Sequence, residues 1–68
     1  MTPSEQAEVA RTLLARKCYC EYCVVHQSRA RDFVEVGPRA VLEAFATPTG
    51  MICSCVESMM EAAQEALS

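Results

Sequence analysis

Two cysteine-rich stretches decide how this chain can fold: CYCEYC at residues 18–23 and CSC at residues 53–55. Together they hold all five cysteines of a 68-residue chain. A chain of this length buries only about 60% of the surface that its unfolded form exposes. Small domains of this kind commonly need disulfides, a metal ion or a partner chain to stay folded. The clustered sulfurs are candidates for such a cross-link.

The start of the chain bears on what the cysteines do. Residues 1–6 show neither the basic start nor the apolar run of a signal peptide. No stretch approaches the roughly 20 apolar residues that a membrane span needs. We therefore expect a cytoplasmic chain with no membrane partner. Cytosolic thiols stay reduced, and an odd number of cysteines cannot close fully into disulfides, so the sequence predicts metal binding.

The composition predicts one folded domain over residues 1–68, because 51% of the residues are apolar. The formal net charge is −3, and all six Lys and Arg residues lie within residues 1–39. The charged residues after them are all glutamates: Glu43, Glu57, Glu61 and Glu65. Nucleic-acid-binding domains are basic, with clustered Lys and Arg. We therefore expect no nucleic-acid partner. A partner protein with a basic surface is the better match for this acidic chain.

The residue pattern predicts an all-α fold that begins with a helix near Thr2. Thr2 can cap this helix, Pro3 suits its first position, and Glu5 can complete a capping box. The helix is expected to end at about residue 16 or 17, and its apolar stripe is Ala7, Ala10, Leu13 and Leu14. Residues 18–25 favour a turn or a short extended piece, although a continuation of the first helix is the alternative.

Three further helices are expected after the first cysteine stretch. The second covers residues 27–36, and Ala30, Phe33 and Val34 face inward. Gly37 and Pro38 separate it from a third helix over residues 38–46, so that the two form a helix-turn-helix hairpin. The third helix buries Val41, Leu42 and Phe45, and the last buries Val56, Met59, Met60, Ala63 and Leu67. A second capping box, Ser54 with Glu57, is expected to open the last helix, which runs to about residue 67.

The cysteines would then lie at both ends of the hairpin. Cys53 and Cys55 flank the N-terminus of the last helix, where unpaired N–H groups and a partial positive charge favour thiolate, the form that binds metals. The other three cysteines follow the first helix. A metal bound by both groups would tie the two ends of the hairpin together.

Zinc is one candidate for this metal, because structural zinc takes four tetrahedral sulfur or nitrogen ligands. Cys20 and Cys23 have the two-residue separation of a zinc knuckle, and Cys53 and Cys55 would complete the set. His26 is a reserve ligand because it follows Cys23 with the same separation. A single histidine at this place is more often a surface or capping residue.

An iron–sulfur cluster is the other candidate, because four cysteine thiolates can hold one. Cys18-x-Cys20, 32 residues and then Cys53-x-Cys55 make a pattern that resembles the bacterioferritin-associated ferredoxin family. Gly37 and the TPTG loop at residues 47–50 add to the likeness, which covers residues 18–60. The resemblance implies a [2Fe–2S] cluster on these four cysteines, with Cys23 and His26 in reserve and the helix over residues 1–17 as an addition.

The two candidates imply different functions. The resemblance implies a small electron-transfer protein, or a subunit of a redox complex, whose partner is a larger redox protein. The zinc site instead implies a helical module for protein interaction or regulation. Nothing in the sequence places His26 near Cys53 as a catalytic base, so we do not expect an enzyme. The oligomeric state stays open.

Overall fold

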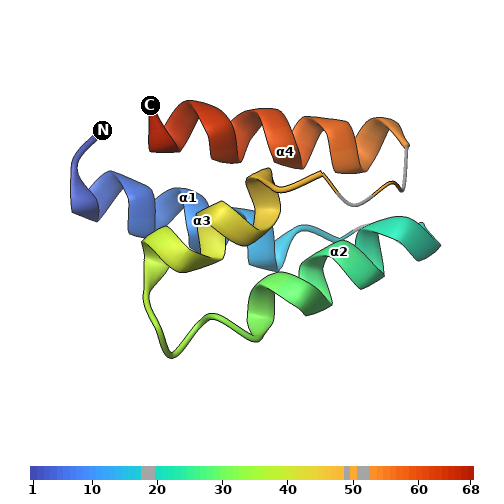
Figure 1. Cartoon of the computed structure of the whole chain (residues 1–68), viewed down its shortest axis with the longest axis horizontal. Helices are drawn as coiled ribbons and strands as arrows, with labels where there is room; N and C mark the ends of the chain where they lie inside the picture. The colour runs from blue at the N-terminus through green and yellow to red at the C-terminus, as the bar shows by residue number, and fades with distance from the viewer. Residues whose placement is uncertain (18–19, 49, 51–52) are drawn as a thin grey trace.

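The computed structural model describes residues 1–17, 20–48, 50 and 53–68, and these residues form four α-helices (Figure 1). The helices are α1 (Pro3–Ala15), α2 (Glu21–Arg31), α3 (Pro38–Ala46) and α4 (Ser54–Leu67). Each of them packs against the other three. The all-α prediction is confirmed. Within the described ranges, no helix has the length and apolar content to cross a membrane.

Helix α1 begins as the sequence predicts. The Thr2 hydroxyl accepts a hydrogen bond from the Glu5 backbone N–H at 3.2 Å, and the Glu5 carboxylate accepts one from the Thr2 backbone N–H at 3.2 Å. This reciprocal pair satisfies two N–H groups that the first turn would otherwise leave without acceptors. Of the expected stripe, Ala10 and Leu13 are buried, while Ala7 and Leu14 are partly buried.

The core lies where α3 and α4 meet the other two helices. Helix α3 has the bounds expected from the sequence, and the three residues predicted to be buried there are buried. On α4, Val56, Met59 and Ala63 are buried as predicted, and Ala66 joins them, while Met60 and Leu67 are partly buried. Among the residues that the structure describes, the buried apolar ones are Ala10, Leu13, Cys23, Ala30, Val41, Leu42, Phe45, Val56, Met59, Ala63 and Ala66. Four of these are alanines, which bury little side-chain surface each.

Helix α2 begins six residues earlier than predicted, and this changes the expected structure around the first cysteine stretch. The expectation of a turn or extended piece as far as Val25 was wrong for residues 21–25, which are helical. The buried face of α2 consists of Cys23, His26, Gln27 and Ala30. These residues have the i, i+3, i+4, i+7 spacing of one helix face, and their packing overrides the preference of the tyrosine and valines for extended structure.

Helix α2 also ends earlier than expected, at Arg31. Residues 32–36 form a turn in which the N–H groups of Phe33 and Val34 donate to carbonyls three residues back. The prediction that Phe33 and Val34 face inward was wrong, because 44% and 51% of their surfaces are exposed. Gly37 then precedes α3 with a φ of 142°, a backbone conformation that residues with a Cβ rarely adopt.

Side chains of α2 fix that helix against the end of α1. The buried Gln27 amide donates to the backbone carbonyls of Leu13 at 2.9 Å and Arg16 at 2.7 Å. Arg31 donates to the carbonyl of Leu14 at 3.3 Å. These carbonyls lie at the C-terminal end of α1, where the regular hydrogen bonds of a helix run out, although the Leu13 carbonyl also accepts the Arg16 N–H. The bonds therefore fix where the chain leaves α1 and enters the cysteine stretch.

His26 joins α2 to α3. The expectation of a surface or capping histidine was wrong, because only 1% of the residue is exposed. Its Nε2 lies 2.9 Å from the Phe45 carbonyl oxygen, and the two rings meet edge to face at 5.4 Å. A carbonyl only accepts, so Nε2 carries the proton. The buried Nδ1 has no hydrogen-bond partner within the described residues.

We expect His26 to stay neutral in the folded protein at a pH where a free histidine is charged. Burial lowers the pKa of His26 below 6.5; the Phe45 carbonyl partly opposes this, and the charge of Arg29 adds to it. The unfolded chain then binds a proton as the pH falls through about 6.5, whereas the folded chain does not until a lower pH. Stability linked to His26 is therefore complete above pH 6.5 and declines between 6.5 and the folded-state pKa.

Nuclear magnetic resonance can check this directly, because His26 is the single histidine of the chain. Its ring signals in the folded protein should titrate below pH 6.5. Since the titration is read on folded molecules, a loss of stability does not disturb it. A titration midpoint at or above 6.5 would contradict the prediction. In urea unfolding, His26→Gln should remove the contribution of this residue to the pH dependence.

Candidate metal centre

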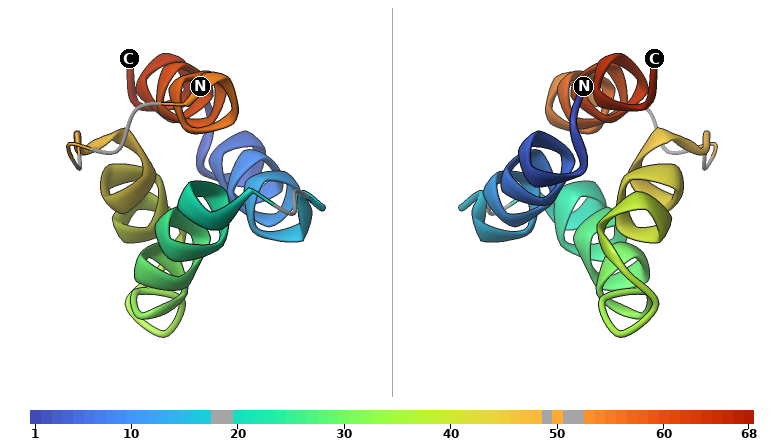
Figure 2. Two further views of the ribbon diagram at one scale, coloured as in Figure 1. Left: turned by 90° about the vertical axis from the view of Figure 1, so that its right-hand side faces the viewer. Right: turned by 90° about the vertical axis from the view of Figure 1, so that its left-hand side faces the viewer.

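The N-terminal ends of α2 and α4 come together at one end of the bundle, to the right in Figure 1 and facing the viewer in the left panel of Figure 2. Cys20 is the N-cap of α2, and Cys53 is the N-cap of α4. Ser, Thr, Asp and Asn are the usual residues at this position. Two cysteines in their place depart from the usual capping preference, and such departures are expected at functional sites.

The start of α4 differs by one residue from the sequence prediction. The expected capping box of Ser54 with Glu57 was wrong, because Ser54 is already the first residue of the helix. The cap is instead the Cys53 sulfur, which accepts a hydrogen bond from the Val56 backbone N–H at 3.4 Å. The helix therefore aims its free N–H groups at a cysteine sulfur.

Three sulfurs meet at this end of the bundle. The Cys53 Sγ lies 3.7 Å from the Cys20 Sγ and 3.9 Å from the Cys23 Sγ, and all three lie within 4.8 Å of one another. A disulfide needs a separation of about 2.05 Å, so these distances are not those of a bonded pair. Two thiolates on one tetrahedral zinc ion, with Zn–S bonds of about 2.3 Å, lie roughly 3.8 Å apart. The three cysteines are thus close enough to hold a metal ion.

The surroundings of the Cys53 sulfur favour its thiolate form. The pKa of the Cys53 thiol is lowered, first by the hydrogen bond from the Val56 N–H and then by those from the Cys20 and Cys23 thiols and the Cys55 N–H, while burial opposes the shift. The positive ends of the α2 and α4 dipoles act in the same direction. Cys23 is fully buried, whereas Cys20 and Cys53 are partly buried. The three thiols thus lie close together, and two of them are partly exposed to solvent.

The five cysteines have different positions relative to this centre. Cys20 and Cys53, two of the four predicted ligands, belong to the group of three sulfurs, and the third member is Cys23, a reserve candidate. Cys55 lies in the first turn of α4, outside that group, and is partly buried. Cys18 lies outside the described residues. His26, the other reserve candidate, is likewise outside the group and uses its Nε2 on the Phe45 carbonyl.

The position of Cys23 follows from the early start of α2. With Cys20 at the N-cap, Cys23 is the third helical residue, and both side chains lie at the same end of the helix. The two-residue separation of Cys20 and Cys23 was the sequence signal for this arrangement. Comparisons of the chain with protein-family models, curated proteins and solved structures gave no match.

Proposed function

We propose that this protein is a small helical interaction module whose fold is held by one zinc ion. Cys20, Cys23 and Cys53 supply three ligands. We assign the fourth to Cys55, the other thiol of the second stretch, which lies two residues from Cys53 in the first turn of α4. Zinc suits this donor set, because four thiolates around one ion are a common structural zinc site.

The proposal rests on one observation: three cysteine sulfurs lie close to one another at one end of the bundle. In a [2Fe–2S] cluster the four thiolates are divided between two irons, with two on each. Three thiolates within 4.8 Å of one another, at separations of 3.7 and 3.9 Å from Cys53, fit a single tetrahedral ion better. Such an ion would supply charge neutralisation and a cross-link, with no redox chemistry of its own.

The many small side chains in the described part of the core support a structural role for the ion. Of the eleven buried apolar residues within the described part of the chain, four are alanines, which bury little side-chain surface. A link among Cys20, Cys23 and Cys53 would join the start of α2 to the start of α4. It would therefore hold together the segments that enter and leave the α2–α3 hairpin. Metal binding of this kind contributes directly to the free energy of folding, because the unfolded chain has no preformed site.

An electron-transfer protein with a [2Fe–2S] cluster is the second candidate. The observation that favours it is the Cys53 sulfur, which accepts N–H hydrogen bonds at a helix end and lies beside Cys20. Hydrogen bonds to sulfur are one of the ways by which proteins tune the potential of such clusters. The ferredoxin resemblance implies the same two cysteines, together with Cys18 and Cys55.

Metal analysis and a visible spectrum separate the two candidates. The chain, purified without oxygen, is expected to be colourless and to contain one zinc per chain. Removing the zinc with a chelator should also remove much of its helical circular dichroism, because the helices are then left without their cross-link. A red-brown protein with two irons and two sulfides per chain would contradict the zinc proposal and favour electron transfer.

A further inference from the structure

The Cys20 and Cys53 sulfurs are close enough to be joined after a small movement. The Cys20 thiol donates to the Cys53 sulfur at 3.7 Å, and the two residues are 33 positions apart in the sequence. Both are partly exposed, so a small solute can reach them, whereas Cys23 is fully buried. A disulfide is about 2.05 Å long, so the sulfurs must approach each other by roughly 1.7 Å. A change of side-chain rotamer moves a sulfur further than this.

Two thiols neighbour the Cys53 sulfur, and their positions on α2 differ. Cys20 precedes the helix, its backbone is extended, and its side chain makes no capping hydrogen bond to α2. Cys23 is the third residue of the helix and belongs to its buried face, so moving its sulfur disturbs closely packed side chains. The geometry therefore favours Cys20 over Cys23 as the residue that joins Cys53.

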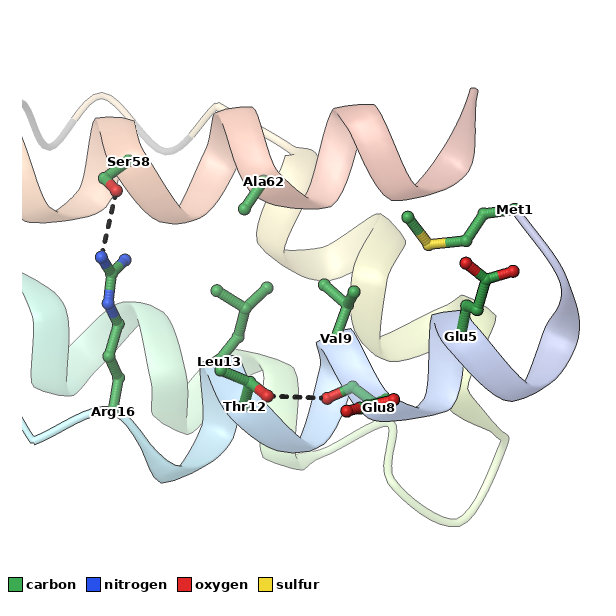
Figure 3. A pocket seen from close by; sticks show the side chains of 9 residues that line it. All are labelled: Met1, Glu5, Glu8, Val9, Thr12, Leu13, Arg16, Ser58 and Ala62. Atoms are coloured by element: carbon green, nitrogen blue, oxygen red, sulfur yellow. Dashed lines mark hydrogen bonds between the residues drawn. The ribbon is translucent and has the colours of Figure 1, made fainter.

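Bonds outside the metal centre hold α2 and α4 near each other. Arg16, at the end of α1, donates from its guanidinium to the Ser58 hydroxyl on α4 at 3.1 Å (Figure 3). The backbone carbonyl of Arg16 accepts the Gln27 amide of α2 at 2.7 Å. Arg16 thus links α2 to α4 without any sulfur. Such bonds are individually weak, so they position the two helices but leave the fold dependent on a cross-link.

We propose that Cys20 and Cys53 are the oxidisable pair of the zinc site, which hydrogen peroxide or another two-electron oxidant joins in a disulfide, with release of the ion. The inference rests on the proposed function, because zinc release presupposes the zinc site. The disulfide would link the starts of α2 and α4, which are the same elements that the ion links. Oxidation would therefore exchange a metal cross-link for a covalent one and leave the helices folded.

The Cys53 sulfur is the expected site of reaction with the peroxide, because it is partly exposed and the Val56 N–H stabilises its negative charge. It attacks one peroxide oxygen, the O–O bond breaks and hydroxide leaves, which gives the sulfenic acid. The Cys20 sulfur then attacks the Cys53 sulfur, so the S–S bond forms as the S–O bond breaks. Two thiolates lose two electrons, and the peroxide takes these up with two protons from solvent to become two water molecules. The thiolates that remain, Cys23 and Cys55, are fewer than the four ligands of a structural zinc ion.

Peroxide treatment of the zinc-loaded full chain tests the release. We expect a small excess of hydrogen peroxide to free one zinc per chain, measured with a zinc-sensitive dye, and to lower the mass of the chain by two hydrogen atoms. Circular dichroism should stay helical after oxidation, whereas chelation of the reduced chain removes much of the signal. A reducing agent with added zinc should restore the bound ion. Retention of the zinc, or its release with loss of the helical signal, would overturn the proposal.

Proteolysis after glutamate identifies which cysteines the oxidation has joined. It is performed on oxidised Cys18→Ser, in which Cys20 is the single cysteine of the fragment with residues 9–21. We expect this fragment to be linked to the fragment with residues 44–57. Tandem mass spectrometry of the linked pair should assign the second sulfur to Cys53.

Two other disulfides would contradict this assignment. A bond between Cys23 and Cys53 would appear as a link from the fragment with residues 22–35 and would show that the buried thiol is the one that reacts. A bond that contains Cys55 would show that the second stretch pairs through its other cysteine. Either product would overturn the proposal that Cys20 and Cys53 form the oxidisable pair.

The rate of oxidation in matched serine variants is a second measurement. Cys20→Ser removes the sulfur that attacks the sulfenic acid, so disulfide formation at Cys53 should slow by about tenfold or more, and dimedone should trap the sulfenic acid. Cys18→Ser changes the same stretch and should keep the rate of the unaltered chain. Equal rates in the two variants would overturn the role of Cys20. Should Cys20→Ser fail to fold, the fragment map of Cys18→Ser still decides.

Metal content separates this inference from the proposed function. A zinc-bound chain in which peroxide joins no cysteines would overturn the inference and leave the zinc site intact. A chain isolated with iron and sulfide would overturn the zinc proposal, and the fragment map of that chain after removal of the cluster would still decide whether Cys20 and Cys53 pair.

Discussion

Replacing Cys23 by serine is expected to reduce the bound zinc from one ion per chain to nearly none. Cys23 is fully buried, and its sulfur lies 3.9 Å from that of Cys53, so its side chain is held at the proposed site. A serine hydroxyl is a hard oxygen donor and a poor substitute for thiolate on a thiophilic metal. Metal analysis of the purified variant, with its thermal unfolding, measures the effect. The unfolding midpoint should fall together with the zinc content.

Cys18→Ser is the matched control for this prediction. It removes one thiol from the same stretch, and zinc content should stay at one per chain because the proposed ligand set does not include Cys18. The reverse result, in which Cys18→Ser loses the metal and Cys23→Ser keeps it, is what the ferredoxin-like ligand set implies. That result would contradict the zinc proposal.

The second large effect is expected in the core, at Phe45. Phe45 is fully buried on α3, and its ring contacts His26. Phe45→Ala should lower the free energy of unfolding by about 3–5 kcal/mol, through lost burial and the cavity left behind. A domain of this size has a total stability of roughly 3–10 kcal/mol, so the variant should be largely or marginally unfolded.

Urea unfolding of the zinc-saturated protein checks the Phe45 prediction. Val36→Ala is the control, because 74% of Val36 is exposed in the turn before α3. That change should alter the free energy of unfolding by less than about 0.5 kcal/mol. Equal effects of the two substitutions would contradict the placement of Phe45 in the core.

A helix was predicted accurately where residues next to it in the sequence determine its bounds, and inaccurately where distant contacts do. Helix α3 was predicted with both bounds correct, because Gly37 and Pro38 mark its start and its three large apolar residues have helical spacing. Helix α2 was placed six residues too late. Its buried face contains His26 and Gln27, and polar side chains become part of a core only through partners such as Leu13 and Phe45 that lie far away in sequence.

The dependence of α2 on tertiary packing also determines which parts of the metal centre could be predicted from the sequence. The two cysteine stretches were expected to meet, and Cys20 and Cys53 do. Which sulfurs meet depends on where α2 begins, because that start makes Cys20 the N-cap and turns Cys23 into the core. The start was set by tertiary packing, so the choice between Cys18 and Cys23 could not be made from spacing alone.

X-ray absorption at the edge of the bound metal tests most directly whether these cysteines hold a single ion. We predict a zinc centre with four sulfur neighbours at about 2.3 Å and no second metal close by. Cys55→Ser should replace one of the four sulfurs with a lighter atom and leave the other three. Fewer than three sulfur neighbours, or a neighbouring iron as in a [2Fe–2S] cluster, would contradict the account.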